Sequence, residues 1–282
     1  MVTTKEVLAV LINYRDAKRS FDCIESLQNN RVDKIIVWDN SEDGGDSLSA
    51  LEAYISGFRN IKTVYSEKNL GFAAAINRLL ALCKEKHPNS YVLIINNDAV
   101  LLKDGTNILI SALEQNNDHV LAVPMINHGG LVTGASYYNK WFALISPHQK
   151  KGYFRYPSGC CLLIKIEKIS IPFFDEEFFM YGEDCELGWR LPSQAVAYVD
   201  NVLVNHEGSA SSGLGSRFYE ERLVAAHLIL ARKIARNNAE YALFLMFRLL
   251  VLPMRACIRS FRFCSLVPFY ALFSGFKIAW FD

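Results

Sequence analysis

A short polar run, Asn96-Asn97-Asp98, directly follows the apolar segment Tyr91–Ile95. A carboxylate at the end of a strand, in a region otherwise poor in charge, suits a hard divalent cation that bridges phosphate oxygens. Asn and Asp also favour turns and helix caps. The residue types alone therefore leave two interpretations open, a metal site and a simple turn.

The densest group of reactive side chains lies in residues 174–190, where acids stand among aromatic rings. Glu183 and Asp184 open a predicted helix in which Glu186 and Arg190 are four residues apart, a spacing that favours an ion pair. Burial among aromatic rings raises the pKa of a carboxyl group, whereas a helix N-terminus lowers it. One acid of the Glu183-Asp184 pair could take a proton from a sugar hydroxyl. The alternative is an ordinary acidic first turn.

A third candidate is His206, which follows the apolar run 195–204 and precedes a loop rich in Gly and Ser. A histidine at a strand end could ligate a metal. A lone histidine is more often a capped loop residue, so this position by itself is weak support for a metal site.

The elements that must position these residues alternate between strands and helices. Apolar runs at residues 7–12, 35–38 and 91–95 have strand length, are rich in β-branched residues and end in polar residues; they predict buried parallel strands. Apolar spacing predicts helices over 17–29 and 71–86. Ligands of such α/β sheets bind at the carboxyl ends of the strands, where the polar runs lie.

The pattern changes after about residue 105. Loops rich in Gly, Asn, Tyr and His precede an apolar strand at 160–166, and residues 217–236 are predicted to be helical. From residue 241 the chain is mostly apolar with scattered arginines.

Composition limits the classes of protein that this chain can belong to. Its 282 residues are 51% hydrophobic and 21% charged, which is enough for a substantial core and excludes a disordered chain or a disulfide miniprotein. The seven cysteines include no C-x-x-C pair, so a zinc ribbon or redox motif is not expected. The N-terminal residues lack the pattern of a signal peptide, and a cytoplasmic location is predicted.

The charges are distributed unevenly. Lys and Arg number 30 against 29 Asp and Glu, but from Arg222 onward there are nine basic residues and two acids, a balance of +7, which leaves −6 for residues 1–221. A basic tail that follows an acidic body predicts that the tail binds an anionic surface. Nucleic acid is not a predicted partner.

In order along the chain, these segments resemble glycosyltransferase family 2 over roughly residues 5–230. The family consists of inverting, metal-dependent transferases of the GT-A fold, and the resemblance is strongest to a bacterial branch that includes rhamnosyltransferases. The segments that carry it are Asn13-Tyr14, Trp38-Asp-Asn-Ser-Glu-Asp-Gly44, Asn69-Leu-Gly-Phe-Ala-Ala-Ala-Ile-Asn77, Asn96-Asn97-Asp98, Ser158-Gly-Cys-Cys161, Phe174 to Arg190, and His206.

The resemblance implies an α/β fold of GT-A (Rossmann-like) type, with a mostly parallel central sheet flanked by helices. The tail beyond the resemblance is expected, from its own residues, to add C-terminal amphipathic helices. We accordingly expect residues 1–105 to bind the nucleotide sugar and 106–236 to form the acceptor-binding and catalytic half of the same domain. Residues 237–282 are expected to be a membrane-associating tail.

The resemblance also implies roles for single residues. Asp184 matches the catalytic base, and Asp98 with His206 matches the ligands of Mg²⁺ or Mn²⁺. Two departures are Asn96, where many relatives carry the first Asp of a D-x-D motif, and Glu186 in place of a later Asp. The implied donor contacts are Asn13, Tyr14, Asp39, Asn69, Gly71, Asn77 and Asn97, and the implied acceptor contacts are Gly159, Tyr181, Glu183, Trp189 and Arg190.

The activity implied is transfer of a sugar from a dTDP- or UDP-linked donor to a lipid-linked oligosaccharide during cell-surface polysaccharide assembly, of the O-antigen (lipopolysaccharide) or capsule type. The resemblance favours dTDP-L-rhamnose as donor, with UDP-galactofuranose, UDP-glucose or another UDP-hexose as alternatives. A sugar-nucleotide pyrophosphorylase is disfavoured because residues 13–18 contain no glycine for a phosphate loop. A membrane-bound glycan-binding scaffold on a degenerate transferase fold is the alternative that is not an enzyme.

The tail carries its own pattern. Arg248, Arg255, Arg259 and Arg262 are spaced 7, 4 and 3 residues apart and share one face of a helix that is otherwise apolar. The longest charge-free stretch of the tail, 14 residues, is shorter than the roughly 20 that span a bilayer. These features predict a helix lying in the plane of the inner membrane surface, with its arginines reaching lipid phosphates. The alternative is an apolar helix pair docked on the catalytic domain or on a second subunit of a homodimer.

Overall fold

The computed structural model describes residues 5–207 and 213–281, which divide into two compact units. The sheet unit comprises Met1–Ala135, Pro157–Phe174 and Leu191–Gly208, and the helical unit comprises Ser136–Tyr156, Asp175–Arg190 and Ser209–Asp282. The functional division expected at residues 105 and 236 stays a prediction.

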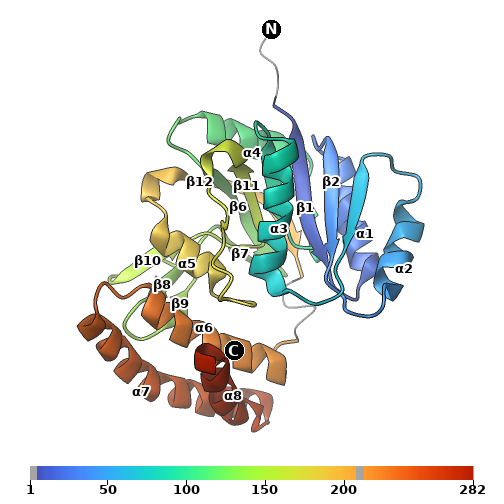
Figure 1. The fold of residues 1–282 in the computed structure, drawn as a ribbon. Helices are drawn as coiled ribbons and strands as arrows, with labels where there is room; N and C mark the ends of the chain where they lie inside the picture. Colours follow the sequence, from blue (N-terminus) through green and yellow to red (C-terminus); the bar gives the residue numbers. More distant parts are fainter. Residues whose placement is uncertain (1–4, 208–212, 282) are drawn as a thin grey trace. The chain divides into compact units, whose positions relative to one another are not determined.

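The sheet unit is built on a nine-stranded sheet with strand order β3-β2-β1-β4-β11-β6-β12-β5, and β7 pairs with β6 (Figure 1). The strands β1, β2, β3 and β4 form parallel pairs, as do β6 and β12. β11 and β5 pair antiparallel with their neighbours. The predicted α/β fold with a mostly parallel central sheet is therefore confirmed. The strands are β1 (Val7–Asn13), β2 (Lys34–Asp39), β3 (Ile61–Tyr65), β4 (Tyr91–Ile95), β5 (Ala99–Leu101), β6 (Leu121–His128), β7 (Leu131–Thr133), β11 (Cys161–Lys165) and β12 (Val196–His206).

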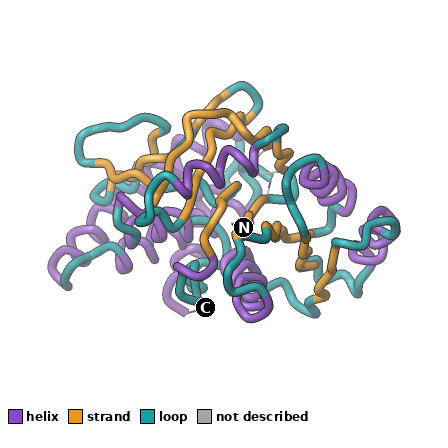
Figure 2. The backbone as a smooth tube through the Cα atoms, turned by 90° about the horizontal axis from the view of Figure 1, so that it is seen from above, coloured by secondary structure: helices purple, strands orange, loops and turns teal. Residues whose placement is uncertain are grey.

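Helices flank this sheet because its central strands are apolar on both faces. Every residue of β4 is buried, and in β1 alternate residues Val7, Ala9 and Leu11 join a core that includes side chains of α1, α2 and α4. In Figure 1, α3 lies across the front of β1, and Figure 2 shows helices on either side of the strands near the N-terminus. These helices are α1 (Ala17–Gln28), α2 (Asp46–Ile55), α3 (Gly71–Lys86) and α4 (Gly105–Glu114).

The helical unit combines a small antiparallel sheet with four helices. The sheet has strand order β10-β8-β9, and α6 supplies much of the buried apolar surface of the unit. Its elements are β8 (Ser136–Asn139), β9 (Leu144–Ser146), β10 (Tyr153–Tyr156), α5 (Glu183–Arg190), α6 (Arg217–Lys233), α7 (Asn238–Phe263) and α8 (Val267–Phe281). α7 continues through Pro253 as one helix.

Arg248 and Arg259 of the arginine stripe on α7 face inward, which corrects the expectation that the whole stripe reaches lipid phosphates. Arg248 is fully buried, and its guanidinium donates hydrogen bonds of 2.7 Å to the carbonyl oxygens of Lys140 and Trp141. Arg259 donates to the buried carboxylate of Glu220 at 2.7 Å. An arginine held in this way has exchanged water for protein acceptors and is not available to a membrane.

The other two arginines differ from each other. Arg255 is half-buried and donates to Nε2 of His227 at 2.8 Å, whereas Arg262 is exposed. Burial lowers the pKa of His227, which therefore stays neutral and can accept this bond. Of the four arginines, only Arg262 is exposed, as the sequence-based prediction expected for all four.

Candidate active site

A network of buried polar side chains lies at the carboxyl ends of β1, β2 and β4. The side-chain amide of Asn13 donates to Oδ1 of Asp39 at 2.7 Å, and the Ser41 hydroxyl donates to the same oxygen at 2.7 Å. The Ser20 hydroxyl donates to Oδ1 of Asn13 at 2.6 Å, and the Asn97 amide donates to Ser20 at 3.1 Å. The network therefore joins three of the predicted donor contacts through two serines that the sequence analysis did not single out.

The parallel register of β1 and β2 explains this meeting. Asn13 and Asp39 are partners at the last residue of each strand, so their side chains leave the sheet at the same edge. Oδ2 of Asp39 is buried and lacks a hydrogen-bond partner among the described residues. A buried carboxylate oxygen without a partner is costly, so a hydroxyl or amide of a ligand is the expected donor at this position.

Asn69 and Gly71 shape the loop that enters α3. The Asn40 amide donates to Oδ1 of Asn69 at 2.8 Å and to the carbonyl of Gly71 at 3.1 Å. Gly71 has φ +77°, a left-handed conformation that favours glycine. The contacts of these two residues therefore support shaping of the site, and a direct donor contact by them stays a prediction.

Asn77 hydrogen bonds to a backbone segment of the sheet unit. Its side chain is 2% exposed; its amide donates to the carbonyl of Phe174 at 2.8 Å, and its oxygen accepts from the backbone of Phe173 and Phe174. These contacts support a structural function for the side chain, and a direct donor contact stays a prediction. Tyr14 is half-buried, with the Arg15 guanidinium 5.5 Å from its ring centre, and remains a candidate donor contact.

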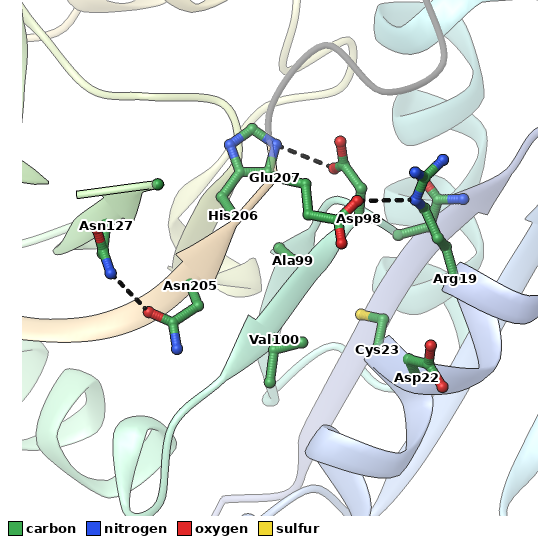
Figure 3. A pocket seen from close by; sticks show the side chains of 12 residues that line it. Arg19, Asp22, Cys23, Asp98, Ala99, Val100, Asn127, Asn205, His206 and Glu207 are labelled. Carbon is green, nitrogen blue, oxygen red and sulfur yellow. Dashed lines mark hydrogen bonds and ion pairs between the residues drawn. The ribbon is translucent and has the colours of Figure 1, made fainter. Parts of the chain in front are cut away.

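Asp98 and His206, predicted as metal ligands from positions 108 residues apart, lie next to each other. Nε2 of His206 is 3.0 Å from Oδ1 of Asp98, and the two side chains are 10% and 8% exposed (Figure 3). β5, which begins directly after Asp98, pairs antiparallel with β12 and places His206 opposite Ala99. Sheet pairing therefore brings the two side chains together.

The chemistry of this pair fits a divalent cation. A carboxylate oxygen and an imidazole nitrogen suit Mg²⁺ or Mn²⁺, with further positions left for water or phosphate oxygens. Within residues 5–207 and 213–281 there is no group of three or more His, Cys, Asp and Glu side chains that could hold a metal.

A cavity of about 380 Å³ adjoins the pair, and its lining reveals residues that the sequence analysis missed. Arg19 and Glu207 form an ion pair of 3.0 Å there, and Asn127 donates to Asn205 at 3.1 Å (Figure 3). Arg19 also pairs with Asp16 at 2.7 Å. The sequence pointed to these residues through their positions alone. Arg19 lies in the first turn of a predicted helix, and Glu207 directly follows His206.

The predicted base lies in the helical unit, at the start of α5. Glu183 is 7% exposed, and burial, reinforced by the neighbouring charge of Asp184, raises its pKa to about 8. Its Oε2 lacks a hydrogen-bond partner among the described residues. Asp184 is half-buried and accepts a 2.7 Å hydrogen bond from the backbone N–H of Cys185. The first of the two acids is thus held protonated at neutral pH.

The turn before α5 requires glycine. Gly182 has φ +95°, and a Cβ there would lie 2.8 Å from the ring of Phe178. The predicted ion pair between Glu186 and Arg190 is present, at 3.0 Å. This turn and this pair hold the first residues of α5 in place, Glu183 and Asp184 among them.

The predicted acceptor residues divide between the units. Tyr181 packs against Tyr219, with ring centres 5.2 Å apart, and Trp189 packs against Phe154 at 4.9 Å; both belong to the helical unit, as do Glu183 and Arg190. Gly159 is buried in the sheet unit. Convergence of Asp184 with Asp98 and His206 stays a prediction.

In a comparison with known protein families, the chain matches the model of glycosyl transferase family 2. The match covers residues 9–170, more than half of the 282 residues. The chain belongs to glycosyl transferase family 2. The matched range contains the Asn13–Asp39 network and Asp98, whereas Asp184 and His206 lie beyond it. A search of curated proteins found no match.

Solved structures of other glycosyltransferases share the GT-A fold of this family member. GalNAc-T7, crystallised with UDP, GalNAc and Mn²⁺, has a TM-score of 0.57 at 13% identity over 81% of this chain. This chain spans 48% of that longer protein. TarS 1–349 of S. aureus has a TM-score of 0.51 in two structures. The structure of TarS with UDP is 14% identical and covers 88% of this chain and 70% of TarS. The other structure of TarS is 13% identical and covers 86% of this chain and 69% of TarS. At such identities the likeness shows the fold alone.

Proposed function

We propose that this family-2 glycosyltransferase is an inverting, metal-dependent enzyme that transfers L-rhamnose from dTDP-L-rhamnose to a lipid-linked glycan. The observation that carries the catalytic part is the pairing of Asp98 with His206 at 3.0 Å, at the end of the sheet where Asn13 and Asp39 meet. The family supports the reaction class. UDP-galactofuranose and UDP-hexoses are the alternative donors.

In this proposal the sheet unit binds the donor. The unpartnered Oδ2 of Asp39 accepts a hydrogen bond from the base or the ribose, and Asn13 and Ser41 hold that carboxylate in place. Asp98 and His206 hold Mg²⁺ or Mn²⁺, in keeping with the Mn²⁺ and UDP crystallised with GalNAc-T7. When bound, the cation offsets the charge that develops on the leaving diphosphate.

Asp184 is proposed as the general base. It would take the proton of an acceptor hydroxyl while the hydroxyl oxygen attacks the anomeric carbon, which inverts that carbon in one displacement. Burial raises the pKa of Glu183 and so favours its protonated form, which makes Asp184 the member of the pair that we propose as the base. Tyr181, Trp189 and Arg190 are proposed to contact the acceptor.

The donor is identified by incubating the full chain and Mn²⁺ with dTDP-L-rhamnose, UDP-galactofuranose or UDP-glucose and measuring the nucleoside diphosphate released. We expect release from one donor, abolished by EDTA and lowered at least about tenfold by Asp98→Asn. Asp118→Asn is the control, because Asp118 follows α4 and takes no part in the site. Binding of these donors without metal-dependent release, with and without a lipid-linked acceptor, favours the alternative of a glycan-binding scaffold.

We further propose that the enzyme binds peripherally to the inner face of the membrane through the outer face of α7 and α8. α7 is long and apolar enough to cross a bilayer by length and composition, a property that the core helix of a soluble protein can share. Its buried arginines are bound to protein groups, which favours a helix lying on the surface. The outer face is strongly apolar and exposes Leu249, Leu250, Met254, Ile258, Phe261, Tyr270, Phe273 and Phe281.

A further inference from the structure

A second histidine, His128, lies directly behind His206 in the sheet unit. Their Nδ1 atoms are 3.0 Å apart, and the two rings meet edge to face with centres 5.0 Å apart. The other ring nitrogen of His206, Nε2, is the one 3.0 Å from Asp98. Asp98, His206 and His128 thus form a linear chain of contacts in which His206 is central.

The backbone fixes this arrangement. His128 is the last residue of β6 and His206 the last residue of β12, and these strands pair in parallel with Asn127 opposite Asn205. The side chains of Asn127 and Asn205 are hydrogen bonded at 3.1 Å, which ties the two strand ends together one residue before the histidines. The imidazoles are therefore held by paired strands and not by a loose loop.

Hydrogen-bond chemistry dictates where the ring protons lie. A carboxylate only accepts, so Nε2 of His206 carries a proton when it contacts Asp98, and Nδ1 of a neutral His206 then accepts from Nδ1–H of His128. To offer Nε2 as a metal ligand, His206 must carry its proton on Nδ1 instead. That N–H then needs an acceptor, which Nδ1 of His128 provides once the proton of His128 is on its Nε2. Both rings stay neutral, and the total number of protons is unchanged.

We infer that His128 is a positioning residue that selects the metal-binding tautomer of His206 and fixes the orientation of its ring. The inference rests on the proposed function, because it assumes that Asp98 and His206 hold the cation. His128 acts through His206, because Nδ1 of His128 contacts Nδ1 of His206. Partners of this kind behind a ligating histidine typically change metal affinity by about 10–100-fold.

The first test measures Mn²⁺ binding to the full chain, with UDP present, from the electron paramagnetic resonance signal of free Mn²⁺. His128→Phe keeps a ring of similar size but removes the acceptor, and we expect it to weaken Mn²⁺ binding by about 10–100-fold. His128→Asn places an amide near the position of Nδ1 and is expected to bind within about threefold of the wild type. His148→Gln, on an exposed residue of the helical unit, is the matched control and should bind as the wild type does.

The outcomes separate the two hypotheses. If the wild type binds Mn²⁺, Asp98→Asn abolishes binding and His128→Phe binds normally, the role of His128 is overturned while the metal site stands. If the wild type binds no Mn²⁺, or Asp98→Asn binds it unchanged, the metal site itself is overturned and His128 loses its proposed role with it.

A second test uses only the wild-type protein and so does not depend on the folding of a variant. ¹⁵N NMR of labelled imidazoles distinguishes a protonated from an unprotonated ring nitrogen, and Mg²⁺ with UDP avoids the paramagnetism of Mn²⁺. On adding Mg²⁺ we expect the proton of His206 to move from Nε2 to Nδ1 and that of His128 from Nδ1 to Nε2. A His128 ring whose protonation pattern is unchanged while that of His206 changes overturns the inference.

Discussion

Two regions of this molecule bury polar side chains, and they differ in how completely those side chains are paired. In the helical unit, Arg248 and Arg259 are each held by acceptors of the same unit. At the strand ends of the sheet unit, Asp39 keeps a buried oxygen without a described partner, and Asp98 and His206 lie 3.0 Å apart beside a cavity. A complete set of partners stabilises the fold, whereas a buried polar atom without a described partner at a candidate site is a position where we expect a ligand to bind.

Glu183 belongs with the incomplete sites although it lies in the helical unit. Its carboxyl is buried with one oxygen unpartnered among the described residues, and its neighbour Asp184 is the predicted base. The difference between the two kinds of site therefore depends on whether each buried polar atom has a hydrogen-bond partner. It does not depend on the unit in which the residue lies. Substitutions at incomplete sites should change activity, and substitutions at complete sites should change stability.

The largest effect is expected at Asp184. Asp184→Asn should lower turnover by about two to four orders of magnitude, because a general base usually contributes that much to the rate. Donor binding, measured by calorimetry with the nucleoside diphosphate, should stay nearly unchanged. Asp118→Asn is the control, because Asp118 follows α4 and lies outside the site. Near-normal turnover of Asp184→Asn would remove this residue from the role of base.

Removing the guanidinium of Arg248 should unfold the helical unit more readily. Arg248→Met leaves the carbonyls of Lys140 and Trp141 buried without their donor, which should cost about 3 kcal/mol in the free energy of unfolding. Urea denaturation measures this cost. Arg262→Met, on the exposed member of the same stripe, should stay within about 0.5 kcal/mol of the wild type. Equal losses in the two variants would contradict the difference between buried and exposed arginines.

The raised pKa of Glu183, about 8, predicts a specific dependence of stability on pH. The folded chain binds this proton more tightly than the unfolded chain, whose carboxyl has an ordinary pKa of about 4.3. The stabilisation is therefore complete below that value and is lost as pH rises through about 8, by up to about 1.4 kcal/mol per pH unit. Unfolding by urea at pH 6 and pH 9 measures it, and Glu183→Gln should lose less stability over this range than the wild type. An identical pH profile for both proteins would show that Glu183 is not held protonated.

The smallest effect is expected on the outer face of α8. Phe273, 81% exposed, should contribute about 1 kcal/mol to binding of vesicles that contain anionic lipid, so Phe273→Ser should lower binding about fivefold. Leu131→Ser is the matched control, because Leu131 is an exposed apolar residue of the sheet unit. Co-sedimentation of the full chain with vesicles measures both. Unchanged binding of Phe273→Ser, or equal losses in the two variants, would argue against this face as the membrane contact.

Sequence reasoning predicted the strands better than it predicted the orientation of the tail. Runs such as Val7–Ile12 and Tyr91–Ile95 are apolar on both faces, which is typical of a strand covered by helices, and both are strands of the sheet. The shorter strands β5 and β7 give no such run, since three residues are too few for a periodic pattern. β5 is nevertheless the strand that aligns Asp98 with His206.

The amino-acid sequence by itself determined the alternation of strands and helices, the polar residues at the strand ends and the shared helical face of four arginines, because each depends on neighbours within a few residues. Only the tertiary structure decided that Arg248 and Arg259 turn inward, to Lys140, Trp141 and Glu220. It alone also placed His128 behind His206. Periodicity shows which side chains lie together on a helix or strand, but the element that packs against them comes from distant parts of the chain, and it decides whether a charge meets water, protein or a ligand.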